Sequence, residues 1–167
     1  MRKVRWVVGL SLTLGLCLLL AVPALAQSDY VSGVFPRDIY GPLNEGYDLL
    51  AAGTYDAAAV QFEKVTKLDN TNPFALNNLA AIQAQKGNVR EAMAFLQQAT
   101  LKADLYKQQV AQTCFVAGLC TAVKPKQEMG ATSTIAPIIR DNIAKLQPKF
   151  DALPPQPSSP PPMTPKK

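Results

Sequence analysis

Residues 78–99 read NLAAIQAQKGNVREAMAFLQQA, and this stretch decides the fold. Apolar residues recur in it at three- and four-residue steps, which is the spacing of one face of an α-helix. Gly87 interrupts the pattern, so the stretch predicts two helices joined by a tight turn. We find no comparable stretch in which apolar and polar residues alternate as they would in a half-buried β-strand.

The same pattern occurs 34 residues earlier in the chain, where Gly53 corresponds to Gly87 and Ala58 to Ala92. The other matched pairs are Gly46 with Ala80, Tyr55 with Val89, Phe62 with Leu96, and Val65 with Ala99. A fixed period of this length is typical of repeat proteins. Asn72-Pro73 marks the start of the second unit, because Asn favours the capping position and Pro the first helical position.

Asn78-Leu79-Ala80, the Gly87-x-Val89-x-x-Ala92 step, Leu96 and Ala99 resemble the tetratricopeptide repeat family. The first unit repeats the pattern with Gly46, Gly53-x-Tyr55-x-x-Ala58, Phe62 and Val65. The resemblance implies two antiparallel helix pairs, one over residues 39–72 and one over residues 73–106. Each pair buries its apolar face only against a neighbour, so further helices should complete the core.

Residues 107–149 are predicted to supply these capping helices, with a cysteine-containing turn. Tyr106, Val110 and Cys114 follow at four-residue steps and predict a helix from Asp104 to about Val116, and residues 124–133 are predicted to form a loop. A last helix begins after Thr134 and ends before Pro148; its apolar stripe is Ile135, Ile138, Ile139, Ile143 and Leu146. We favour a core role for that stripe, with contact to a partner as the alternative.

The predicted fold class is therefore all-α: a tetratricopeptide-like α-solenoid of about two repeats with additional C-terminal helices. Residues 27–38 are predicted to be an N-terminal linker. Residues 150–167 are predicted to be a disordered tail, since seven of the chain's 14 prolines lie from Pro154 onward.

The first 26 residues have the parts of a secretory signal peptide. Three basic residues precede an apolar run, and Ala24-Leu25-Ala26 follows Pro23 as a cleavage site. Export predicts a periplasmic or secreted protein, and retention of the leader as an inner-membrane anchor is the alternative. Cleavage removes three of the 17 basic residues and none of the 12 acidic ones, which lowers the formal net charge from +5 to +2.

Cys114 and Cys120 are the two cysteines beyond the leader, in a compartment that permits disulfides. Six residues of continuous helix would separate them by about 9 Å, which is too far for a bond. A turn near Gly118 would bring them together, so we expect a structural disulfide between them. A redox-active pair is the alternative, but the thioredoxin-like spacing is missing.

The composition predicts binding rather than catalysis. The chain has no histidine, which excludes histidine-based acid–base chemistry and histidine metal ligands. There is no glycine-rich phosphate loop and no nucleophile elbow, so we expect no catalytic residue, metal or cofactor. The charge that remains after cleavage is too small to favour nucleic-acid binding.

The resemblance places the functional surface on the concave face, which the first helix of each pair lines. The residues that it implies for binding a protein or peptide are Tyr40, Asn44, Tyr47, Ala51, Phe74, Asn77, Asn78, Ala81 and Gln85. The alternative for Asn78 is a role in helix packing, and for Tyr47 a place in the core. None of the nine is Lys or Arg, so a receptor for C-terminal carboxylates is disfavoured.

The sequence thus predicts an exported adaptor or scaffold that binds a protein or peptide segment, with a role in bacterial envelope assembly or secretion. The alternative is a self-associating or membrane-anchored envelope component that uses the isoleucine-rich C-terminal helix as its interface.

Overall fold

A computed structural model describes residues 33–155 of the chain. The predicted signal peptide, residues 27–32 of the linker and residues 156–167 of the tail lie outside this range. The described elements are α1 (Arg37–Ala51), α2 (Tyr55–Leu68), α3 (Pro73–Gln85), α4 (Val89–Thr100), the short 3₁₀ helix η2 (Ala103–Leu105), β1 (Gln108–Val116), β2 (Cys120–Met129) and α5 (Ile135–Asp151).

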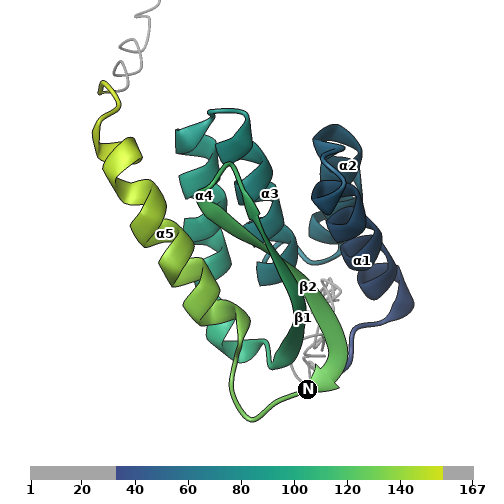
Figure 1. Ribbon diagram of the computed structural model, residues 1–167. Coiled ribbons are helices and arrows are strands. Elements are labelled where there is room, and N and C mark those ends of the chain that lie inside the picture. Colours follow the sequence, from purple (N-terminus) through teal and green to yellow (C-terminus); the bar gives the residue numbers. More distant parts are fainter. Residues whose placement is uncertain (1–32, 156–167) are drawn as a thin grey trace, which may run out of the picture.

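The two predicted helix pairs are present. Helix α1 packs on α2 and α3 on α4, and α2 joins the pairs by packing on α3 (Figure 1). Gly53 and Gly87 each end a first helix with φ near +80°, a conformation that glycine adopts without strain. Matched residues of the two second helices have no exposed surface: Ala58, Phe62, Val65, Ala92, Leu96 and Ala99.

Asn72 caps α3 as the sequence predicts. Its Oδ1 accepts hydrogen bonds from the backbone N–H groups of Phe74 and Ala75, at 3.2 and 3.1 Å. Pro73 takes the first helical position, where its missing N–H costs nothing. These local signals fix the start of the second repeat.

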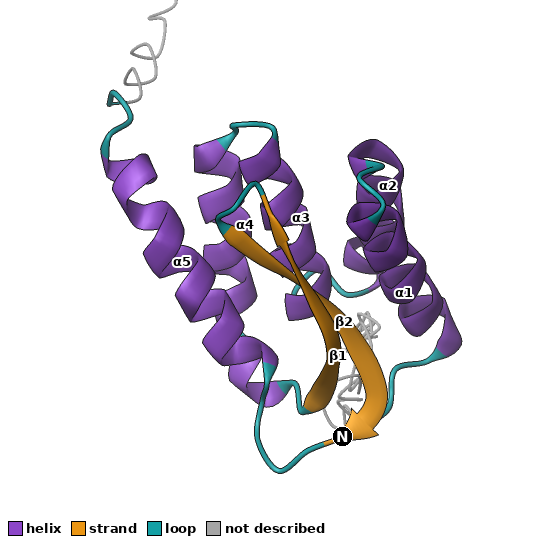
Figure 2. Cartoon of the chain, viewed as in Figure 1, coloured by secondary structure: helices purple, strands orange, loops and turns teal. Residues whose placement is uncertain are grey.

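The predicted helix over Asp104–Val116 and the predicted loop over 124–133 are wrong. Most of this region forms an antiparallel hairpin of β1 and β2, shown as orange strands in Figure 2. Ala117 and Gly118 connect the strands with φ of +54° and +65°, and Leu119 N–H bonds to Val116 O at 3.1 Å. Two successive positive φ angles define a turn whose twist matches that of a hairpin. The fold is therefore not purely all-α.

The predicted disulfide is absent as well, because Cys114 and Cys120 are free cysteines. The register of the hairpin sets Cys114 opposite Ala122 and Cys120 opposite Val116. The turn predicted near Gly118 exists, but it brings other residues into direct opposition. Burial raises the pKa of the Cys120 thiol to about 11, so this side chain is neutral at pH 7.

Helix α5 packs against α4 and closes the array as a third layer. Ile135, Ile139 and Leu146 of the apolar stripe have no exposed surface and belong to the core, whereas Ile138 and Ile143 are half-buried against it. The helix continues through Pro148 to Asp151, past the predicted end. Pro148 lacks the backbone N–H that would bond to the preceding turn of the helix. Because Pro148 is exposed, the carbonyl left without that bond faces water.

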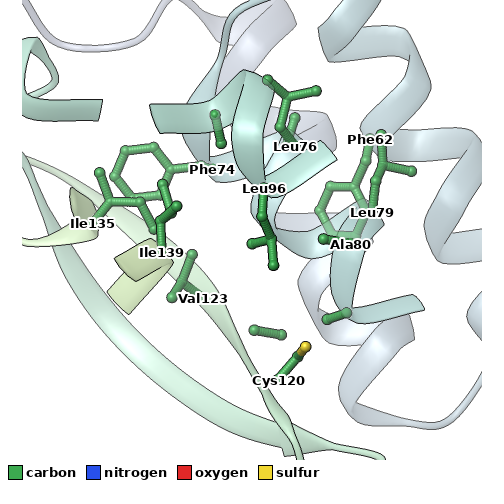
Figure 3. Packing of buried hydrophobic residues seen from close by; sticks show 14 of the residues in the cluster. Phe62, Phe74, Leu76, Leu79, Ala80, Leu96, Cys120, Val123, Ile135 and Ile139 are labelled. Carbon is green, nitrogen blue, oxygen red and sulfur yellow. The ribbon is translucent and has the colours of Figure 1, made fainter. Parts of the chain in front are cut away.

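Helices and hairpin share one hydrophobic core. Figure 3 shows Val123 of β2 beside Ile139 of α5, and Phe74 of α3 beside Ile135. Gly46 of α1 lies directly against the ring of Phe62, since an added Cβ would stand 2.7 Å from Phe62 Cε1. This contact sets the close approach of α1 and α2.

We expect Gly46→Ala to lower the free energy of unfolding by about 1–3 kcal/mol, because the added methyl group overpacks the α1–α2 contact. Urea denaturation would measure the loss. In a Phe62→Leu background the same substitution should cost clearly less, since the ring edge that it meets is gone. Equal costs in both backgrounds would contradict a clash with Phe62.

Ala117→Gly should raise the free energy of unfolding by about 1 kcal/mol, because it removes the strain of a side chain at positive φ. Ala94→Gly on the exposed side of α4 is the matched control and should lower it by about 1 kcal/mol. Urea denaturation would measure both free energies of unfolding. If the two substitutions changed them in the same direction, the left-handed conformation at Ala117 would be contradicted.

Candidate protein-binding groove

The face predicted to bind a partner holds the protein's own hairpin. Strand β2 packs on α3, with α1 on one side and α5 on the other (Figure 1). Thr121, Ala122 and Val123 at the middle of this contact are buried. The first helices of the repeats therefore form a groove, and an extended segment of the same chain occupies it.

Asn78 binds both backbone groups of Val123. Its Nδ2 donates to Val123 O at 2.7 Å, and its Oδ1 accepts from Val123 N–H at 2.8 Å. Asn77 donates from Nδ2 to Thr121 O at 2.9 Å. Both amides are fully buried. A primary amide offers one donor and one acceptor side by side, so it pairs with a strand edge as a neighbouring strand would.

Asn142 of α5 completes this arrangement, and the sequence analysis missed it. Its Oδ1 accepts from Thr121 N–H at 2.7 Å, and its Nδ2 donates to Thr121 O and to Asn77 Oδ1 at 2.9 and 2.8 Å. The outward-facing N–H and C=O groups of Thr121 and Val123 are thus all paired with asparagine side chains.

A signal for Asn142 was present in the sequence. Pro73 precedes Asn78 by five residues, and Pro137 precedes Asn142 by the same interval. Asn44 stands one 34-residue period before Asn78, so α1 and α3 carry an asparagine at the equivalent position of the repeat. Asn44 differs in that its buried Oδ1 has no hydrogen-bond partner within the described residues.

The hairpin stands edge-on in the groove, with β2 at the floor. On the α1 side, Lys124 Nζ lies 2.6 Å from Asp48 Oδ1 and 5.8 Å from the centre of the Tyr47 ring. On the α5 side, Lys145 Nζ lies 4.8 Å from the centre of the Phe115 ring. Alternate side chains of the hairpin thus contact opposite walls, as the pleat of a strand requires.

Tyr47 also meets Cys114 of β1 through a hydrogen bond. Burial, and next the neighbouring Cys114, raises the pKa of Tyr47 to about 12. Burial likewise raises the pKa of the Cys114 thiol above its usual value. Both groups are neutral at pH 7 and hold the hairpin against α1.

The nine predicted groove residues divide into three sets. Tyr47, Asn77 and Asn78 contact the hairpin. Phe74 and Ala81 lie in the core, where Phe74 meets the Phe35 ring edge-on at 5.6 Å. The residues that keep exposed surface are the half-buried Tyr40 and Asn44 and the exposed Ala51 and Gln85.

A second, shallow hollow lies at the start of α2, away from the hairpin. It is lined by residues 53–57 and Lys86, whose Nζ lies 2.7 Å from Asp56 Oδ1. The hydrogen bond from Lys86 lowers the pKa of Asp56. Within residues 33–155 no group of three metal-ligating side chains occurs, and no helix is long and apolar enough to cross a membrane.

The tetratricopeptide repeat family model matches residues 49–112. This segment contains α2, α3 and α4 in full, with the end of α1 and the start of β1. The match supports tetratricopeptide-type repeats in this segment, and repeats of this family generally act as protein-interaction domains. No match was found among curated proteins or among solved structures.

We expect Asn78→Ala to lower the free energy of unfolding by about 3 kcal/mol, because it leaves two buried backbone groups of Val123 unpaired. Hydrogen exchange at the Val123 amide should accelerate, which would locate the loss at the hairpin. Asn44→Ala is the matched control and should cost less than about 1 kcal/mol, since Asn44 Oδ1 accepts no bond. Equal losses at the two positions would contradict the role assigned to Asn78.

Proposed function

We propose that the protein is an exported adaptor or scaffold that binds an extended segment of another protein. One observation carries this proposal: asparagine amides on α3 and α5 bind the backbone N–H and C=O groups of an extended strand. A face built to pair with backbone groups recognises extended polypeptide with little regard to its side chains.

The open parts of the groove are where we place the partner. Tyr40 and Asn44 line the part nearest the start of α1, while Ala51 and Gln85 stand exposed at the ends of α1 and α3. Tyr40 combines apolar contact area with a polar tip, and Asn44 and Gln85 offer donors and acceptors for a polypeptide backbone. No cation stands among these four residues, which suits a neutral segment.

Export supplies the biological setting of the proposal. The leader favours a periplasmic or secreted location and a role in envelope assembly or secretion, and a retained leader would instead anchor the protein to the inner membrane. The alternative interface, the isoleucine-rich helix, is less favoured because Ile135 and Ile139 have no exposed surface.

Residue-specific photo-crosslinking in the native envelope tests the proposal. A benzophenone side chain at position 40 or 85 should give a crosslinked partner, because both positions border the open groove. The same group at Val60, which is 53% exposed on α2, is the control and should give none.

Equal adducts from all three positions would contradict a groove-specific partner. The absence of adducts from positions 40 and 85 would overturn the adaptor proposal itself.

A further inference from the structure

The two edges of the hairpin differ in how their backbone groups are paired. The edge of β2 is closed, because Asn77, Asn78 and Asn142 satisfy Thr121 and Val123. In an antiparallel pair, directly opposed residues both turn their backbone groups either toward each other or away. The residues opposite Thr121 and Val123 therefore also turn theirs outward.

Those residues are Phe115 and Thr113 of β1. Within residues 33–155 no side chain or backbone group pairs with their outward N–H and C=O groups. Both residues are exposed, and Phe115 has 68% of its surface open. Helices α1 and α5 pack on β2 at the floor of the groove, so this part of β1 lies at the open side.

Nothing in the composition of β1 protects this edge from pairing. Gln108–Val116 contains no charged residue and no proline. Exposed edge strands of soluble proteins usually carry a lysine, a proline or a covering segment, because a bare edge pairs with other strands. A β-bulge at Ala111 bends the lower part of β1, which leaves Gln112–Val116 as the straight and available part.

We propose that this edge of β1 pairs antiparallel with β1 of a second copy of the chain, which forms a two-fold symmetric dimer with a four-stranded sheet. A two-fold axis at Cys114 sets Thr113 of each copy opposite Phe115 of the other. The outward groups of these residues then form four interchain hydrogen bonds. The two Cys114 residues face each other as a pair without backbone hydrogen bonds.

A second copy fits this edge because the strand carries no charge that the two-fold axis could bring near the same charge of the other copy. Equal charges close to the axis would face each other across the pair and destabilise it. The neutral strand β1 carries none. The exposed Phe115 ring meets Thr113 of the other copy, a pairing of aromatic and β-branched side chains that favours sheet formation.

Size-exclusion chromatography with light scattering on the full exported chain tests the dimer. The wild-type protein should show a concentration-dependent mass of two chains. Thr113→Pro removes an outward N–H from each copy without touching the β1–β2 ladder, and should weaken dimerisation about tenfold or more. Thr113→Ala keeps that N–H and should remain a dimer.

Hydrogen exchange supplies a second measurement on the unmodified chain. The Thr113 and Phe115 amides should exchange fast at low protein concentration and slowly at high concentration. Thr113→Lys, which places a charge on the exposed edge without a backbone restriction, should abolish that protection while helicity is unchanged.

A protein that stays monomeric at every concentration would overturn the proposal. A dimer that survives Thr113→Lys, or that leaves the two amides unprotected, would place the interface elsewhere and overturn it as well. Protection of the two amides only in the presence of another protein would assign this edge to that partner instead. None of these results bears on the groove crosslinks at positions 40 and 85.

Discussion

The pairing of Asn78 with the backbone of Val123 is the contact on which the arrangement of the molecule depends. It joins residues 45 apart in the chain and ties the inserted hairpin to the second repeat. A strand buried against helices must find partners for its outer N–H and C=O groups, since unpaired backbone groups in the interior are costly. Asn77, Asn78 and Asn142 supply those partners, and Asn142 thereby joins α5 to β2.

The helical repeats could be predicted because their signals are local. Gly53 and Gly87 end helices and Asn72 starts one, each through contacts within a few residues. The glycine signal recurs after 34 residues, which strengthens the prediction of a repeat. The hairpin could not be predicted in the same way. Tyr106, Val110 and Cys114 match a helical spacing by coincidence, and strand pairing between Gln112 and Lys124 is decided by a turn and by distant helices.

The helices that pack around β2 could be predicted from the sequence, whereas the hairpin that lies between them could not. Residues carried over from the repeat family identify α1 and α3 as walls of the candidate groove, and Asn77 and Asn78 do contact an extended segment. That the segment belongs to the same chain follows only from the three-dimensional structure. Asn142 lies beyond the part of the chain that resembles the family, so the resemblance could not indicate it.

The order of the elements along the chain has a consequence for biogenesis. A polypeptide leaves the ribosome or an export channel from one end, and its earlier parts can fold first. The two repeats are complete at residue 100, whereas Asn142 emerges 42 residues later, after the whole hairpin. Until Thr121 and Val123 have emerged, the amides of Asn77 and Asn78 lack their backbone partners. The nascent protein therefore passes through a stage in which the groove is open, and its own hairpin fills the groove before α5 is complete.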